Sequence, residues 1–402
     1  MPSSPFLWYV SWLLRRPPTP PPTTFMSDLD TDRTRVGRLM QTARALLAKG
    51  GSLESSGESA PLAQNDISLA LEQYVRQSGV VDDIDPKLVA TEVLSQVKSA
   101  LDKSPEDETQ FRLSDEEWSS LEAIVQVTGR PALGYKEEQV EMPNEVGANQ
   151  HWAVLIATAR TTINQVSSSV GRVSRKSKGT QELIGTAWRI GESLVVTNRH
   201  VAARLVFQPN DPISSWELEP GKIPRVCFDA SGLQEFSVKG IVYCSPEDAV
   251  DLAILQLDCG GNTPPPPLRL DWAPESIGVE IFEPGEPKPT FKGKQIYLVG
   301  HPYHRVASNA VAKVFGNADG SKRFSPGYVT SIEETELEHD CSTLGGNSGS
   351  CVLSAGSHRV VGLHHGSREV DRWSGRGSAN VALAFSRLPG GPATAILKSG
   401  RA

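Results

Sequence analysis

The stretch ELIGTAWRIGESLVVTNRHV, residues 182–201, contains two short apolar runs separated by Gly191 and Glu192. Comparable runs of Val, Ile and Leu recur from about residue 166 onward, separated by Gly, Pro and Asn: FSVKGIVYC, DLAILQL, QIYLVG, SCVL and RVVGLHH. Short runs between turn residues, without long helical patterns among them, are typical of antiparallel barrels or sandwiches. We therefore expect two packed β-barrels, connected by the polyproline segment NTPPPP at residues 262–267.

Residues 26–130 carry helical patterns instead of strand patterns. Apolar residues recur at helical spacing in residues 31–49, in residues 67–75, from Pro86 onward and after Ser114. After Pro86, Val89, Val93 and Val97 follow one another at intervals of four, and proline in a first turn sacrifices no hydrogen bond. Ser114 and Glu117 have the spacing of a capping box. The chain is thus α+β overall, with an N-terminal helical region whose apolar faces suit packing or a regulatory partner.

The 402 residues are a soft prior for two or three domains, at roughly 100 to 200 residues per domain. Changes in composition divide the chain into five segments. They are an extension or non-native start at 1–25, the helical region at 26–130, a connecting segment at 131–165, the barrel domain at 166–390 and a tail at 391–402.

The composition excludes several classes of protein. With 38% apolar and 22% charged residues and a mean hydropathy of −0.28, the chain is of soluble, globular type. A net charge of −7 provides no global positive field for nucleic acid. The longest apolar run, FLWYVSWLL at residues 6–14, is shorter than the roughly 18 to 20 residues that a membrane span requires.

The N-terminus and the cysteines bear on the compartment. Basic residues follow the run at 6–14 instead of preceding it, and PPTPPP takes the place of a small-residue cleavage site. We therefore expect a cytoplasmic protein, with secretion or membrane tethering through residues 1–25 as the alternative. Five cysteines, an odd number in a long chain, favour reduced thiols over a disulfide scaffold.

Three segments carry a His, an Asp and a Ser in that order: SLVVTNRHVA with His200, EDAVDLAILQL with Asp251, and STLGGNSGSCVL with Ser348. Serine hydrolysis requires a hydroxyl activated by an imidazole and a carboxylate that orients the imidazole. Asp248 and Asp258 are rival carboxylates, but Asp248 precedes the apolar run and Asp258 ends it. The three segments therefore predict a catalytic triad.

Ser348 lies in the turn Gly-Gly-Asn-Ser-Gly, residues 345–349, where small residues allow a tight bend. Such a bend directs neighbouring backbone N–H groups at one point. We expect the amides of Gly346 and Ser348 to form an oxyanion hole. His339 and Asp340 precede this turn and are expected to support it structurally.

The motifs TNRHV, DLAIL and GGNSGS resemble, in sequence and order, the catalytic blocks of trypsin-like serine peptidases, most closely those of bacterial glutamyl endopeptidases. QIYLVGHP and SPGYVTSI also look like strands of that family, so the resemblance covers about residues 166–390. It implies a chymotrypsin-type pair of six-stranded antiparallel barrels. It also implies a serine endopeptidase that cleaves proteins or peptides through an acyl-enzyme, without a cofactor, with His200 as general base, Asp251 as orienting carboxylate and Ser348 as nucleophile.

The resemblance extends to the pocket for the substrate side chain. In glutamyl endopeptidases, a threonine five residues before the nucleophile and a histidine in the next strand line this pocket, and Thr343 and His364 match these positions. A hydroxyl and an imidazole can both donate hydrogen bonds to a carboxylate. The resemblance therefore implies cleavage after Glu or Asp, although His365 stands where the family has an aromatic residue.

Other readings of the chain remain open. The barrel domain could be a latent or non-catalytic peptide-binding module that acts through the helical region, although the complete triad favours an enzyme. His301 and His304 are three residues apart, but no nearby Cys or second His pair completes a zinc set, so we expect no metal. No Cys lies near His200, where animal trypsin-like enzymes have a disulfide, and this favours a bacterial-type enzyme or a reducing compartment.

Overall fold

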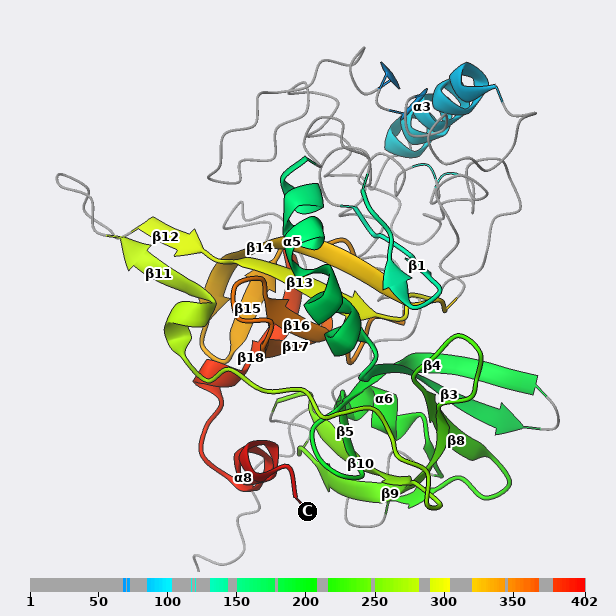
Figure 1. Ribbon diagram of the computed structural model, residues 1–402, viewed down its shortest axis with the longest axis vertical. Coiled ribbons are helices and arrows are strands. Elements are labelled where there is room, and N and C mark those ends of the chain that lie inside the picture. The colour runs from blue at the N-terminus through cyan, green and yellow to red at the C-terminus, as the bar shows by residue number, and fades with distance from the viewer. Residues whose placement is uncertain are drawn as a thin grey trace, which may run out of the picture.

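The structure of the protein is a computed structural model, in which two β-barrels lie next to each other (Figure 1). In Figure 1 the first barrel is green, and the second runs from yellow to red-orange. The structure describes residues 68–69, 71–72, 85–102, 117, 120, 131–143, 150–177, 180–207, 216–246, 250–281, 290–303, 320–343, 346–368 and 379–401.

The first barrel is a closed sheet of six antiparallel strands in the order β10-β5-β4-β3-β8-β9. The strands are β3 (Val170–Ser177), β4 (Thr180–Arg189), β5 (Leu194–Thr197), β8 (Ile223–Cys227), β9 (Glu235–Cys244) and β10 (Ala253–Asp258). The second barrel is also closed and antiparallel, in the order β13-β14-β15-β18-β17-β16. Its strands are β13 (Gln295–Gly300), β14 (Arg323–Glu333), β15 (Glu336–His339), β16 (Cys351–Ser354), β17 (Val360–Arg368) and β18 (Ala379–Ala384). The predicted chymotrypsin-like pair of six-stranded barrels is confirmed.

Shorter elements accompany the barrels. Among the described residues these are the two-stranded pairs β1 (Tyr135–Lys136) with β2 (Gln139–Val140), β6 (Val206–Phe207) with β7 (Glu217–Leu218), and β11 (Gly278–Ile281) with β12 (Thr290–Gly293). The helices are α3 (Pro86–Asp102), α5 (Gln150–Ser167), α6 (Arg199–Ala203) and α8 (Pro392–Ser399), with the 3₁₀ turns η3 (Pro274–Ser276) and η4 (Phe385–Arg387).

Strands β5 and β13 are apolar on both faces because both of their faces are buried. In β5, Val195 packs inside the first barrel, whereas Leu194 and Val196 belong to a separate core shared with the second barrel. In β13, Ile296 and Leu298 line the second barrel, and Tyr297 and Val299 join that shared core. Successive side chains of a strand point to opposite faces. A continuous apolar run is therefore what a strand between two cores requires.

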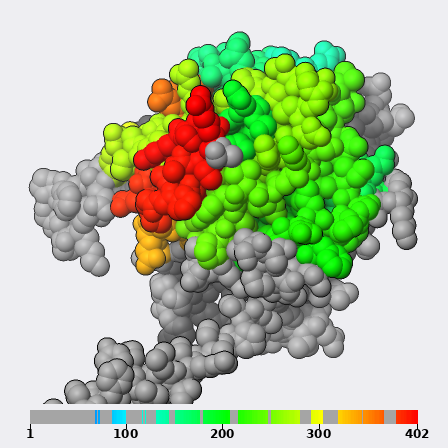
Figure 2. Space-filling view, turned by 90° about the horizontal axis from the view of Figure 1, so that it is seen from below, coloured from blue at the N-terminus to red at the C-terminus, as the bar shows by residue number. Residues whose placement is uncertain are grey.

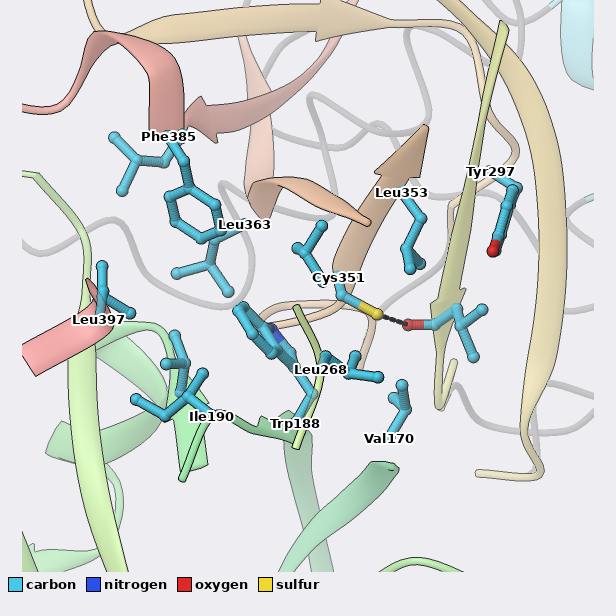
Figure 3. Packing of buried hydrophobic residues seen from close by; sticks show 14 of the residues in the cluster. Val170, Trp188, Ile190, Leu268, Tyr297, Cys351, Leu353, Leu363, Phe385 and Leu397 are labelled. Atoms are coloured by element: carbon cyan, nitrogen blue, oxygen red, sulfur yellow. Dashed lines mark hydrogen bonds between the residues drawn. The ribbon is translucent and has the colours of Figure 1, made fainter. Parts of the chain in front are cut away.

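The shared core holds the two barrels together. In Figure 3, Trp188 of β4 points toward Phe385, which follows β18, and their ring centroids are 6.0 Å apart. Aromatic pairs at this separation are favourable beyond the area that they bury. Buried side chains of residues 131–165 also belong to this core: Leu133, Val140, Ile156 and Ile163. The expected connecting segment therefore packs as part of the two-barrel unit, and α5 runs along the second barrel toward β3 (Figure 1).

The polyproline segment connects the barrels as expected, since residues 262–267 lie between β10 and β13. Ser169 donates a hydrogen bond through Oγ to Pro266 O at 2.6 Å. The backbone N–H of Leu268 donates to Arg189 O at 2.8 Å. In Figure 2, α8 is red and lies beside the yellow-green residues of this connection, and Lys398 Nζ is 4.8 Å from the centre of the Trp272 ring. The tail therefore contributes a helix to the two-barrel unit.

The helical region is described in part. The helix expected from Pro86 is α3, and Val89, Val93 and Val97 on its apolar face are buried. Residues 68–69, 71–72, 117 and 120 are also helical, and Ser99 Oγ on α3 donates a hydrogen bond to Glu117 Oε1 at 2.9 Å. Residues 1–25, the helix expected at 31–49 and the capping residue Ser114 lie outside the described residues.

Three further observations concern the described residues. None of their helices is long and apolar enough to cross a membrane. All five cysteines are among them, and all five are free thiols. They contain no group of three or more His, Cys, Asp and Glu side chains that could hold a metal ion.

Candidate active site

His200 and Asp251 meet at one end of the first barrel. His200 lies on α6, directly after β5, and Asp251 lies two residues before β10, the neighbouring strand. His200 Nδ1 is 2.6 Å from Asp251 Oδ2, and the backbone N–H of His200 donates to Asp251 Oδ1 at 3.1 Å. Because a carboxylate only accepts hydrogen bonds, Nδ1 carries the proton and Nε2 is left as the basic atom.

The carboxyl group of Asp251 is strongly acidic. Burial alone would raise its pKa, but the charge of His200 and the hydrogen bonds from His200 lower the pKa to about 2. Asn198 is fully buried and donates through Nδ2 to the backbone O of Asp251 at 3.0 Å, which fixes the loop. Asp251 is therefore an ionised, oriented partner for the imidazole at any pH near neutrality. The side chain of His200 remains 42% exposed, so substrate can reach it.

Ser348 lies on the second barrel, in the turn before β16, and the first barrel anchors this turn. Thr186 of β4 donates its backbone N–H to Ser348 O at 2.8 Å and its Oγ1 to Gly346 O at 2.9 Å. The backbone N–H of His301 in turn donates to Thr186 Oγ1 at 3.0 Å. Sequence reasoning missed Thr186, since nothing in GTAW distinguishes this threonine from any other strand residue.

Gly185 brings the turn that contains Ser348 close to α6. A Cβ atom at Gly185 would lie 2.8 Å from Val201 Cγ2 and 3.0 Å from Ser348 O. Gly185 therefore lies next to both Val201, the residue after His200, and Ser348, and a larger side chain would not fit there. Ser348 is partly exposed, and no hydrogen bond joins its Oγ to the His200 imidazole in the described structure. Catalytic hydrogen bonds are often long or poorly aligned in structures without substrate.

The turn itself requires glycine at two positions. Gly349 has a φ of +87°, and a Cβ there would lie 2.0 Å from Thr186 O. Gly346 has a φ of +84°, and a Cβ there would lie 2.5 Å from His301 O. Only glycine adopts such angles freely, and only glycine fits these contacts. The close approach of the two barrels thus depends on the small residues of the GGNSGS motif.

The two residues expected in the specificity pocket lie in the second barrel, and no hydrogen bond joins them among the described residues. Thr343 Oγ1 donates to Asn380 Oδ1 at 2.6 Å, and Asn380 Nδ2 donates to Cys341 O at 2.7 Å. His364 is buried, and its Nδ1 lies 3.2 Å from Nε2 of His339. Asn380 and His339 face each other across β18 and β15. Sequence reasoning did not single out Asn380, which has no motif around it.

Asp340 holds the segment before the turn that contains Ser348. Its Oδ1 accepts a hydrogen bond from the backbone N–H of Tyr328 at 2.7 Å, and its own N–H donates to Tyr328 O. His339, one residue earlier, is buried beside His364. These contacts join Asp340 to β14, and the expected support of the turn at residues 345–349 by His339 and Asp340 stays a prediction.

His301 is a buried structural residue in the same region. Its Nδ1 donates a hydrogen bond to Gly320 O at 2.9 Å, and the whole residue is 7% exposed. Burial and the charge of Lys322 lower the pKa of His301 from 6.5 to about 3. His304 lies outside the described residues. The imidazole of His301 is therefore neutral in the folded protein.

We expect His301 to make folding stability depend on pH. The pKa of His301 is lowered on folding, so its stabilising contribution is fully present above pH 6.5 and is lost as the pH falls toward 3. At pH 5 this loss amounts to about 2 kcal/mol relative to pH 7. Urea unfolding at both pH values measures it. His301→Asn keeps a donor near Nδ1 but does not titrate, so its free energy of unfolding should fall less; an equal fall in both proteins would contradict the assignment.

Comparison with known proteins finds a family model and solved structures that are similar to parts of the chain. Residues 185–363 match the family model of the trypsin-like peptidase domain, and this range contains His200, Asp251 and Ser348. The crystal structure of the serine endoprotease from Yersinia pestis is 16% identical, with a TM-score of 0.36, and the match covers 60% of this chain and 66% of that one. The inactive form of Rv3671c from M. tuberculosis H37Rv is also 16% identical, with a TM-score of 0.36 and coverage of 62% and 92%. No curated protein matches the sequence significantly.

Proposed function

Because residues 185–363 match a trypsin-like peptidase domain, which supports a peptidase function, we propose that the chain is a serine endopeptidase with Ser348 as its nucleophile. The observation that carries this proposal is the double hydrogen bond from His200 to Asp251, next to a nucleophile turn held by Thr186. It leaves Nε2 of His200 as the basic atom of a partly exposed side chain, and such an atom can activate a serine hydroxyl.

The reaction proceeds in two steps with the same proton carrier. Ser348 Oγ forms a bond to the scissile carbonyl carbon while its proton passes to His200 Nε2. The C–N bond then breaks, and the leaving amine takes this proton, which leaves an ester on Ser348. A water molecule attacks the ester, gives its proton to His200, and releases the carboxylic acid as Ser348 recovers its proton. Asp251 stays ionised and stabilises the imidazolium form of His200 in both steps.

The amides of Gly346 and Ser348 stabilise the oxyanion in this proposal. Neither amide donates a hydrogen bond to another group in the part of the chain that is described. Thr186 binds the carbonyl groups of the same two residues and so anchors the turn that carries both amides to the first barrel. Preorganised donors of this kind contribute about 3 to 4 kcal/mol each to transition-state stabilisation.

The direct test is digestion of a diverse peptide mixture, with cleavage sites read by mass spectrometry. We expect internal cuts by the wild-type protein and none by Ser348→Ala. Peptides bound but not cut by the wild-type protein would favour a non-catalytic binding module instead. Cuts that persist in Ser348→Ala would overturn the assignment of the nucleophile.

A preference for Glu or Asp before the cut bond is the finer part of the proposal. Thr343 is partly exposed beside the nucleophile turn, and His364 is buried behind it. In this structure the Thr343 hydroxyl donates its one hydrogen bond to Asn380 Oδ1. The orientation of Asn380 is set by its own hydrogen bond to Cys341 O. An acidic substrate would have to compete with Asn380 for this proton. The hydrogen bond gained would be charge-assisted and therefore stronger than the bond lost.

We expect Thr343→Val to lower kcat/KM for a Glu peptide about tenfold or more relative to its Gln counterpart, because a hydrogen bond to a charged group contributes about 1.5 to 3 kcal/mol. Matched Glu and Gln peptides measure this ratio. Thr335→Val makes the same change outside the pocket and should leave the ratio as it is. An unchanged ratio in Thr343→Val would remove this residue from the pocket, and wild-type cuts after other residues would discard the acidic preference while keeping the peptidase.

A further inference from the structure

Thr186 has its side chain buried between the two barrels. It lies on β4 and is fully buried. Its neighbour Ala187 packs inside the first barrel, whereas Trp188 belongs to the core that the two barrels share (Figure 3). Because successive side chains of a strand point to opposite faces, the hydroxyl of Thr186 lies on the face of Trp188, toward the second barrel. A hydroxyl group buried in such a place requires hydrogen-bond partners.

Both partners of this hydroxyl are backbone groups of the second barrel. Thr186 Oγ1 accepts a hydrogen bond from the N–H of His301 at 3.0 Å and donates one to Gly346 O at 2.9 Å. A hydroxyl group can accept and donate at the same time. His301 directly follows β13. One oxygen atom of the first barrel therefore joins the end of β13 to the turn that contains Ser348.

The end of β13 also packs directly against this turn. A Cβ atom at Gly300, the last residue of β13, would lie 2.5 Å from Asn347 Oδ1. A Cβ atom at Gly346 would lie 2.5 Å from His301 O. The two segments are thus in close contact, and Thr186 is bonded to both of them.

The backbone of Thr186 extends this set of bonds to the strand that leads to His200. Its N–H donates to Ser348 O at 2.8 Å, and its O accepts a hydrogen bond from Thr197 Oγ1 at 2.7 Å. Thr197 is fully buried and ends β5, three residues before His200. Thr186 is therefore bonded to Gly346 and Ser348, whose amides form the proposed oxyanion hole, and to the strand before the proposed base.

We propose that the hydroxyl of Thr186 is a positioning group of the catalytic site, which holds the turn of Gly346 and Ser348 where their amides can bind the oxyanion. This role rests on the proposed peptidase function. If the hydroxyl is lost, the N–H of His301 and the carbonyl of Gly346 remain buried without this partner, and such groups are unfavourable. The turn then gains free energy by moving until both groups find other partners or water.

Thr186→Val replaces the hydroxyl with a methyl group of similar size. We expect kcat to fall about 100-fold, because a misplacement of catalytic groups by about 1 Å has an effect of this size. KM should change by only a few fold, because oxyanion donors bind the transition state more strongly than the substrate. Thr186→Ser retains the hydroxyl and should keep kcat within a few fold of wild type. Both constants are measured with a peptide found in the digestion experiment.

Thr180→Val is the matched control, since Thr180 is the exposed first residue of the same strand. It should leave kcat and KM as they are. Wild-type kcat in a folded Thr186→Val protein, a loss confined to KM, or an equal loss of kcat in Thr186→Ser would overturn the proposal. If Thr186→Val does not fold, Thr186→Ala takes its place, with the same expected and contradicting results.

Backbone hydrogen exchange, followed by NMR in the full-length protein, gives a second readout that requires no turnover. The N–H of residue 186 donates to Ser348 O, so its exchange reports whether the turn stays on β4. The N–H of Phe228 donates to Gln234 O elsewhere in the first barrel and serves as the reference. In Thr186→Val we expect exchange at residues 186 and 301 to accelerate by a larger factor than at Phe228. An equal acceleration at all three would indicate a general loss of stability and would contradict the positioning role.

The two readouts separate this inference from the proposed function. A wild-type protein without Ser348-dependent cleavage would refute the peptidase function, while hydrogen exchange would still decide whether the hydroxyl of Thr186 holds the turn. Wild-type cleavage together with unchanged exchange in Thr186→Val would refute the positioning role and keep the peptidase.

Discussion

Ser348→Ala is expected to lower kcat/KM for peptide cleavage by about 10⁴- to 10⁶-fold. The substitution removes the only protein atom that bonds to the substrate carbonyl carbon in the proposed reaction. What remains is binding and the oxyanion donors, which alone give a small residual acceleration over water. The rate is measured with a peptide found in the digestion experiment, under conditions in which substrate is far below KM.

The fold should survive this substitution. The described contacts of Ser348 are made by its backbone O, which Thr186 binds, and alanine keeps that group. The free energy of unfolding should therefore change by about 0.5 kcal/mol or less. Ser350→Ala is the matched control, because its hydroxyl lies two residues away and faces Asn347 Oδ1 at 3.4 Å. Near wild-type turnover by Ser348→Ala, or an equal loss in Ser350→Ala, would contradict the role of Ser348.

Asp251→Asn is expected to reduce kcat by about 10⁴-fold near neutral pH. Both carboxylate oxygens accept hydrogen bonds from His200, and an amide has only one acceptor oxygen to offer. When the amide nitrogen faces Nδ1, it donates, so the ring proton moves to Nε2 and the basic atom no longer faces the serine. The negative charge that stabilises the imidazolium is lost at the same time.

Asp258→Asn is the control for this change. Asp258 ends β10, and its Oδ1 accepts a hydrogen bond from the N–H of Gly260 at 3.2 Å. It lies on the strand that follows Asp251 and has no hydrogen bond to His200 in the described structure. We expect its kcat to remain within a few fold of wild type. A comparable loss in both variants would mean that Asp251 acts through the stability of the first barrel, which thermal unfolding of the two variants would reveal.

Parts of the fold could be read from local pattern because the pattern has a local cause. The interval of four between Val89, Val93 and Val97 predicts α3, and the buried face of α3 contains these residues. Two further helices also have helical patterns in the sequence, which the division of the chain into segments did not use. Trp152, Ile156 and Ile163 recur at helical spacing in α5, and α8 has Pro392 in its first turn and Gly400 after its last. The regulatory partner of residues 26–130 stays a prediction.

Residue type, spacing and order in the sequence determined which groups can carry the chemistry. TNRHV, DLAIL and GGNSGS contain the imidazole, the carboxylate and the hydroxyl, and the glycines of the last motif are the residues that a turn with positive φ requires. The apolar runs determined that strands with two buried faces would form. These properties belong to individual residues or to their near neighbours, so they can be recognised without knowledge of the fold.

Only the tertiary structure decided which distant groups touch. Thr186 binds a turn that lies 160 residues away in the sequence. Thr343 donates a hydrogen bond to Asn380, and Glu336 pairs with His365. Each of these contacts depends on how two barrels close, on the register of their strands and on a bulge in one of them. Register and closure are set by the packing of all the strands together. A local pattern therefore does not specify them, although it specifies every strand that takes part.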